Sequence, residues 1–144
     1  MDGQREDRGA RGDEPADAEH EALIADVFTV ACASRTVLDH VTGRWGVLAL
    51  VALNDGVFRF NALRRRVQGV SEKMLAQTLQ ALERDGFVHR EARPTIPPHV
   101  EYSLTPAGQE VARRLMGLIE VLEASVPEVM AAQARYDAAK AAGA

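Results

Sequence analysis

The sequence predicts a mainly helical fold with one small β-hairpin. Apolar residues recur at helical spacing over most of the chain after residue 20, and short β-type runs occur only within 87–104. Aromatic residues make up 5% of the composition, so aliphatic helix faces must supply most of the core. The 144 residues fit one domain, since ~100–200 residues per domain is usual.

The first part of the chain divides into a polar tail and three helical segments. Residues 1–20 are acidic, rich in Gly, Asp, Glu and Arg and poor in apolar residues, which predicts a flexible tail. Glu21–Ala31 places its apolar residues on one helical stripe, and Ser34–Val41 is expected to form a short helix that ends at Gly43. Trp45–Leu53 is apolar nearly all round, which is typical of a central buried helix.

The middle of the chain predicts two helices joined by a short turn. Phe60–Val67 forms the first helix, with its arginines facing outward, and a Gly-containing turn follows it. Ser71 is expected to cap the second helix, Ser71–Asp85, which ends at Gly86. The side chains expected to be buried on this second helix are Met74, Leu75, Thr78, Leu79 and Leu82.

A hairpin and a long helix complete the prediction. Phe87–Ala92 and Val100–Leu104 are the expected strands, and the prolines between them cannot extend either strand's hydrogen bonding. Thr105 is expected to cap a long amphipathic helix, Pro106–Val126, which Pro127 should interrupt. We therefore expect a tail at 1–20, one domain at 21–126, and an Ala-rich tail at 127–144 whose composition allows one more helix.

This order of elements is typical of a winged helix-turn-helix domain, in which 60–67 and 71–85 form the helix-turn-helix. The outer helices, Glu21–Ala31 and Pro106–Val126, carry more apolar surface than one small domain needs, so we expect them to pair across a two-fold axis in a homodimer. The side chains expected at the dimer contact are Leu23, Val27, Val111, Leu115, Leu118, Ile119 and Leu122.

The net charge of −4 is unevenly distributed along the chain. Residues 1–40 hold ten acidic residues against four Lys and Arg, a net charge of −6. Residues 41–100 hold nine Lys and Arg against five acids, a net charge of +4, and residues 101–144 have a net charge of −2. Because charge acts through local patches, the middle segment favours a polyanionic partner.

One polar face of the 71–85 helix suggests base recognition. Lys73, Gln77 and Gln80 share this face with Arg84; Gln suits the edge of adenine and Lys that of guanine, although many polar helix faces are merely solvated. The Arg64–Arg66 run lies where phosphates would pass, and the hairpin could reach the DNA backbone or a minor groove. The residues expected to contact double-stranded operator DNA are Arg59, Arg64, Arg65, Arg66, Ser71, Lys73, Gln77, Thr78, Gln80, Arg90, Arg93 and His99.

Other classes of function are poorly supported. A single cysteine, Cys32, excludes an internal disulfide framework and a Cys-rich zinc site. The histidines are scattered, and no phosphate-binding Gly loop or nucleophile motif occurs, so we expect no catalytic site, metal or cofactor. No apolar run approaches the ~20 residues that span a bilayer, and the polar N-terminus is unlike a signal peptide. We expect a cytoplasmic protein without a membrane partner.

Several segments carry a family resemblance. They are Gly43–Trp45, Gly56–Asn61, Val70–Leu75, Leu82–Val88, Pro97–Thr105 and Gly108. In this order they resemble the HxlR-type winged-helix transcriptional regulators, relatives of the MarR group. The resemblance implies a bacterial, dimeric, DNA-binding regulator. The sequence departs from the family pattern at Ala33, where a proline usually follows the cysteine, at Ala62, which replaces an acid, and at Gln80, a frequently basic position.

Two questions stay open at the level of sequence. Cys32 is either a packed core thiol or, because Arg35 is close and several family members sense oxidants at the matching cysteine, a redox sensor. The chain could also be a winged-helix module that binds proteins, which should lack the basic residues of the middle segment. A third alternative is a regulator gated by an unidentified effector, a small aromatic molecule bound between the domain and the dimer helices; a cleft there would favour it.

Overall fold

The computed structural model describes residues 27–29 and 32–143. It separates into two compact units, Met1–Asp39 and His40–Ala144. The predicted tail at 1–20, the dimer residue Leu23 and most of the predicted Glu21–Ala31 helix lie outside the described residues. No helix among the residues described is long and apolar enough to cross a membrane.

The helix predicted for Glu21–Ala31 is wrong at Val27–Thr29, which form a turn. The Cys32 amide donates to the Thr29 carbonyl at 3.0 Å, and the Arg35 guanidinium donates to the Phe28 carbonyl at 2.8 Å. These bonds occupy carbonyls that a continuing helix would need. The β-branched residues Val27 and Thr29 also favour a helix less than straight-chain residues do.

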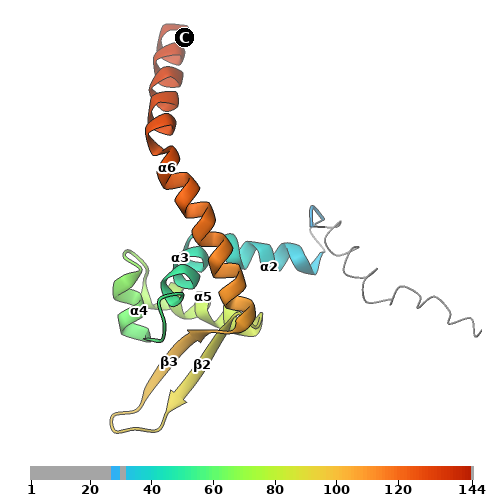
Figure 1. Cartoon of the computed structure of the whole chain (residues 1–144), viewed down its shortest axis with the longest axis vertical. Coiled ribbons are helices and arrows are strands. Elements are labelled where there is room, and N and C mark those ends of the chain that lie inside the picture. The colour runs from blue at the N-terminus through green and yellow to red at the C-terminus, as the bar shows by residue number, and fades with distance from the viewer. Residues whose placement is uncertain (1–26, 30–31, 144) are drawn as a thin grey trace, which may run out of the picture. The chain divides into compact units, whose positions relative to one another are not determined.

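The fold class is confirmed: five helices are described, with one three-stranded antiparallel sheet among them (Figure 1). The helices are α2 (Ala33–Thr42), α3 (Arg44–Leu53), α4 (Phe60–Arg66), α5 (Glu72–Arg84) and α6 (Pro106–Gly143). The strands are β1 (Phe58–Arg59), β2 (Val88–Arg93) and β3 (His99–Leu104), arranged in the order β1-β3-β2. Helices α2 to α5 and strands β2 and β3 begin and end within one residue of the expected positions.

The core of the larger unit forms around α3. Leu50 and Leu53 of α3 are fully buried, as are Leu63 of α4 and the leucines of α5. Burying one such side chain contributes ~1.5–3 kcal/mol, so this cluster supplies much of the unit's stability. Helix α3 packs against both α5 and α6, which makes it the support for the exposed elements on either side.

Helix α5 begins and ends as the sequence predicts. The Ser71 hydroxyl accepts a hydrogen bond from the Met74 amide at 3.1 Å, and Gly86 follows the helix with a φ of 83°, which favours glycine. Leu75 is buried, but Met74 is 41% exposed, which corrects its expected burial. Because neighbouring residues on a helix point ~100° apart, the stripe that holds Leu75 turns Met74 away from the core.

Strand β1 was not anticipated. It has two residues, with Phe58 opposite Tyr102 and Arg59 opposite Glu101 on β3, and a strand that short shows no alternation in its sequence. It nevertheless ties the start of α4 to the hairpin. The β2–β3 hairpin is called the wing below.

The start of α6 is fixed to the junction of α5 and the wing. The Thr105 hydroxyl donates to the Gly86 carbonyl at 2.6 Å and accepts from the Gly108 amide at 3.1 Å. Gly108 is required here, because a Cβ would lie 2.0 Å from the Phe87 carbonyl oxygen. The long helix therefore starts from a rigid base.

Helix α6 continues through Pro127, so the predicted interruption is wrong. The proline removes one amide donor, and the Ala-rich segment that follows, residues 131–142, favours continuation of the helix. Two residues before the proline, the Ser125 hydroxyl donates to the Val121 carbonyl at 2.7 Å, a contact that often bends helices. Figure 1 shows α6 changing direction about halfway along its length.

Candidate nucleic-acid interface

The exposed polar side of α5 is the most regular feature of the larger unit. It consists of Lys73, Gln77, Gln80 and Arg84, all exposed, and is called the polar side of α5 below. The opposite side of the helix carries Leu75, Leu79 and Leu82, each at most 1% exposed. The buried side of α5 therefore anchors the helix in the core, and four polar side chains extend from its opposite face.

The turn between α4 and α5 forms a hollow of about 710 Å³. Arg64, Arg65 and Ser71 line it, which brings together three predicted DNA contacts from two helices. Arg64 is partly committed, because its Nη1 donates to Glu72 Oε1 at 2.7 Å. Both side chains are well exposed, so the pair contributes little stability, but it offsets the charge of Arg64.

Arg65 and Arg66 differ from Arg64 in this respect. Both are exposed, and neither forms an ion pair with any residue in the described part of the chain. Arg65 also lines a second hollow, of about 540 Å³, with Arg59 and with His99 of the wing. The N-terminal half of the helix-turn-helix and the wing thus meet around a set of cationic side chains.

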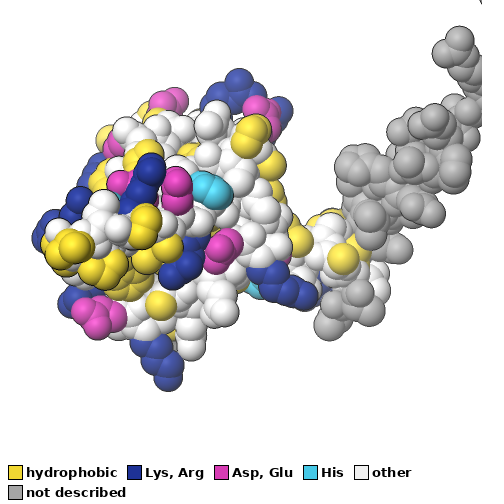
Figure 2. Space-filling view, turned by 90° about the horizontal axis from the view of Figure 1, so that it is seen from below, with side chains coloured by type: hydrophobic (Ala, Val, Ile, Leu, Met, Phe, Trp, Pro, Cys, Tyr) yellow, Lys and Arg dark blue, Asp and Glu magenta, His cyan; other side chains and the backbone are white. Residues whose placement is uncertain are grey.

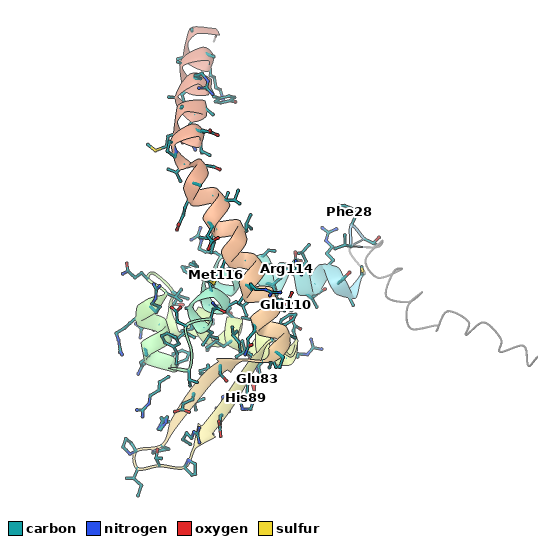
Figure 3. All side chains as sticks on the ribbon, in the orientation of Figure 1. Phe28, Glu83, His89, Glu110, Arg114 and Met116 are labelled. Carbon is teal, nitrogen blue, oxygen red and sulfur yellow. The ribbon has the colours of Figure 1, made fainter. Side chains whose placement is uncertain are left out.

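The two faces of the wing differ. Arg90 stands opposite Tyr102 in the ladder and lines a hollow of about 280 Å³ with Gln80 and Glu83 of α5. This face is next to the polar side of α5. Glu83 of α5 and His89 of β2 mark the junction of helix and wing in Figure 3.

Arg93 lies on the other face and is bound by acidic side chains of the wing itself. Its Nε donates to Glu101 Oε2 at 3.0 Å, and its Nη2 lies 3.4 Å from Glu91 Oε2. The hydrogen bond from Arg93, followed by that from His99, holds the pKa of the Glu101 carboxyl below its usual value. The same bond raises the pKa of Arg93. Arg93 is therefore the least available of the predicted basic contacts.

His99 belongs to the same network. Its Nδ1 lies 3.0 Å from Thr95 Oγ1, and its Nε2 lies 3.3 Å from Glu101 Oε1. Thr78, on α5, is half-buried beside the core, so it is less exposed than its neighbours on the polar side.

The sequence-based prediction omitted two residues of this surface. Asn61 lines both hollows beside α4, and Gln68 lines the hollow at the turn. Asn61 precedes Arg65 by four residues, so both lie on one face of α4. That spacing could have identified Asn61 from the sequence. Gln68 lies in a turn, where no such periodicity applies.

The residues predicted for dimer contact fall into two groups. Leu115 is 8% exposed in the core of its own chain, and Val111 packs against that core. Beyond them the helix emerges from the domain: Leu118 is 53% exposed and Leu122 54%, with Ile119 half-buried between them. Val27, in the smaller unit, is half-buried.

Cys32 lies just before α2 in the smaller unit. It is 8% exposed, and its Sγ is 2.9 Å from Ser34 Oγ. Arg35 directs its Nη1 to the Phe28 carbonyl, so that donor is not aimed at the thiol.

A further hollow, of about 620 Å³, lies beside the first two turns of α6. Leu53, Val57 and Leu104 give it an apolar floor, and Gln109 and Arg113 of α6 are on its rim. Glu110, also on the rim, has its pKa lowered by the hydrogen bond from Arg113 and, to a smaller extent, by Arg114. Figure 3 shows Glu110 and Arg114 together on α6, one turn apart.

Comparison with known proteins identifies the family of this chain. The model of the HxlR-like helix-turn-helix family matches residues 40–130, which is more than half of the chain. The chain belongs to the HxlR-like helix-turn-helix family. The matched HxlR-like region runs from the end of α2 through the helix-turn-helix and wing into α6. The resemblance noted from the sequence is thereby confirmed.

Two further comparisons agree with the HxlR-like assignment. The chain is 58% identical over 106 residues to an uncharacterized HTH-type transcriptional regulator, YtfH of Escherichia coli (strain K12), covering 74% of this chain and 84% of that protein. The solved structure of ytfH from Salmonella typhimurium has 57% identity and a TM-score of 0.70, covering 74% of this chain and 95% of that chain. This HxlR-like protein is a transcriptional regulator with a helix-turn-helix domain.

A third similar structure is that of the redox regulator HypR in its oxidized form. It shares 36% identity with this chain at a TM-score of 0.59, covering 65% of this chain and 96% of HypR.

Proposed function

We propose that this HxlR-like regulator binds double-stranded DNA as a homodimer, with the polar side of α5 in the major groove. The observation that carries the proposal is that this side of α5 is fully polar and exposed while its reverse is locked into the core. A helix of this kind can enter the major groove without losing its support, and Gln77 and Gln80 suit the edge of adenine.

The basic residues beside α5 contact the phosphates of the DNA backbone. Arg65 and Arg66 are exposed at the end of α4, and Arg59 and Arg65 continue the cationic surface toward the wing. Phosphate contacts of this kind position the protein without selecting a sequence. A module that binds only proteins would have no need of this set.

The dimer contact is assigned to the emergent part of α6. Large apolar side chains remain exposed there, among them Leu118, Leu122, Val126 and Val129. A second copy related by a two-fold axis would bury the same stripe on both chains. Two α5 helices would then meet half-sites about one helical turn apart, ~10 bp or a multiple of it.

Selection of duplexes from a random library, followed by footprinting and measurement of the mass in solution, tests this function. We expect one enriched sequence with two half-sites and a dimer at micromolar protein. A monomer that protects no site at moderate salt would contradict the proposal and favour a protein-binding module.

We also propose that modification of Cys32 regulates binding. Support comes from the position of Cys32 directly before α2 and from the similarity to HypR, whose structure is named as an oxidized redox regulator. With one cysteine per chain, oxidation by diamide can join Cys32 of two chains, each thiol losing one hydrogen to the diamide. Diamide should release the wild-type protein from DNA and leave Cys32→Ser bound; equal responses would refute the regulation while leaving DNA binding intact.

The hollow below α6 supports a second candidate function, control by a small molecule. It lies between the domain and the proposed dimer helix, and its floor is apolar with polar groups at the rim. A panel of small aromatic molecules, tested by thermal shift, should raise the Tm of the wild-type protein and not that of Val57→Trp, whose side chain would fill the hollow. No shift with any compound would remove this candidate.

A further inference from the structure

The tip of the wing is apolar, and the exposed side chains of Arg59 and Arg65 lie beside it. Residues 94–98, called the tip below, contain no charged side chain. Ile96 is fully exposed, and the three prolines beside it are exposed as well. Figure 2 looks onto this end of the molecule and shows hydrophobic side chains gathered between Lys and Arg side chains. An isolated surface isoleucine is ordinary, but an apolar tip on a projecting hairpin has a defined position.

The tip is also stiff. Thr95 Oγ1 donates to the Pro97 carbonyl at 2.9 Å and lies 3.0 Å from His99 Nδ1. Arg93 and His99 close the ladder directly below. Prolines fix φ and have few conformations to lose. Ile96 is therefore held outward on a preorganised loop.

The charges around the tip do not make it a phosphate contact. Arg93, the nearest cation on β2, is bound by Glu91 and Glu101. The available arginines, Arg59 and Arg65, lie below the tip and share a hollow with Pro97 and Pro98. A DNA backbone held by Arg59 and Arg65 would thus run directly beside the apolar tip.

We infer that Ile96 is a wedge that enters the minor groove of the bound DNA and partly unstacks one base step. The inference rests on the proposed DNA binding and extends it to Ile96, whose side chain cannot form hydrogen bonds with the bases. Minor-groove proteins use isoleucine and proline in this way, bending the duplex at the step they enter. The fully exposed Ile96 side chain leaves water when it inserts, which offsets part of the cost of unstacking.

The wedge predicts a sequence preference at a position that no hydrogen bond reads. Pyrimidine–purine steps such as TA and CA unstack easily, whereas A-tracts are stiff. We therefore expect the selected DNA to hold a flexible step where the wing crosses the minor groove, beside each half-site.

The test places 2-aminopurine, a fluorescent base quenched by stacking, at successive positions of the selected duplex. With wild-type protein, the fluorescence should rise at one step per half-site. Ile96→Ala should abolish the rise and lower the affinity about five- to tenfold, in the range of one altered base pair. Leu48→Ala, which shortens another exposed apolar residue (39% exposed) outside the tip, is the matched control and should behave as wild type.

A second measurement distinguishes insertion of Ile96 from a tip that only touches the outside of the duplex. Replacing the flexible step by an A-tract, a run of adenines on one strand, should weaken DNA binding by the wild type about five- to tenfold. The same replacement should leave DNA binding by Ile96→Ala unchanged. Equal affinities of wild type and Ile96→Ala, with no fluorescence change, would overturn the wedge alone and assign the tip to a protein contact. If the wild type binds no duplex, the proposed function fails first, and the wedge fails with it.

Discussion

The polar side of α5 and the wing both carry basic residues, but the two regions treat them differently. On α5, Lys73 and Arg84 extend into solvent from a buried helix. On the wing, Arg93 is held between two carboxylates of its own hairpin. Arg93 reaches Glu101 diagonally across the hairpin and Glu91 two residues earlier on its own strand, whereas neither Lys73 nor Arg84 forms an ion pair with a described residue. The charge that a basic residue makes available therefore depends on the carboxylates within its reach, on the hairpin for Arg93 and on helices for Arg64 and Arg113.

The largest expected effect concerns the buried side of α5, which packs into the core. Leu79→Ala removes a side chain that is 1% exposed and should lower the free energy of unfolding by ~2–5 kcal/mol. Met74→Ala, on the same helix but 41% exposed, is the control and should cost much less. Urea unfolding followed by circular dichroism measures both. Equal losses would mean that α5 does not depend on this stripe for its support.

The next effect separates Arg65 and Arg66, which form no ion pair with a described residue, from Arg93, which is ion-paired. Arg65→Ala with Arg66→Ala should weaken binding to all duplexes and reduce the slope of log K against log salt by about 2, since each phosphate contact contributes ~0.9. Arg93→Ala should leave the slope nearly unchanged. Fluorescence anisotropy at salt concentrations of roughly 50 to 200 mM measures this slope. A slope change in Arg93→Ala as large as that in the double variant would erase the proposed difference between helix and wing.

The smallest effect is a pH dependence of the wing. Hydrogen bonds from Arg93 and His99 lower the pKa of Glu101 in the folded state. The stabilisation is thus fully present above the unfolded pKa of ~4.3, and it is lost as the pH falls through the lowered folded value. The protection factors of the wing amides, which correct for the pH dependence of intrinsic exchange, should fall in acid for the wild type, and those of Glu101→Gln should be low already at neutral pH. A variant with wild-type exchange at both pH values would show that the pair does not stiffen the wing.

The sequence predicted the helices well because their signals are local. Ser71 and Gly86 delimit α5 by capping and by a positive φ, and both signals are visible in single residues. Strand β1 depends on pairing with Tyr102 and Glu101, far along the chain, so no local pattern announces it. Pro127 gave the wrong signal, because a long helix that continues into an Ala-rich segment tolerates one missing donor.

The exposed polar surface of the candidate site was predicted in part for the same reason. Helical spacing identified Lys73, Gln77 and Gln80 together, and the structure leaves all three exposed. The commitments of Arg64 to Glu72 and of Arg93 to Glu101 each join residues eight positions apart across a turn. Such pairs depend on the tertiary path of the chain, so the charge that the sequence offers exceeds the charge that the surface makes available.

In the proposed complex, the polar side of α5 recognises the bases while the arginines of α4 only position the DNA. The most direct test compares the affinities of Gln77→Ala and Arg66→Ala for the selected duplex and for random DNA. Gln77→Ala should lose discrimination at one or two base pairs, by ~1–3 kcal/mol, and keep its affinity for random DNA. Arg66→Ala should lose affinity for both duplexes alike. If Gln77→Ala weakens binding to both duplexes equally, α5 does not read the bases and the account is wrong.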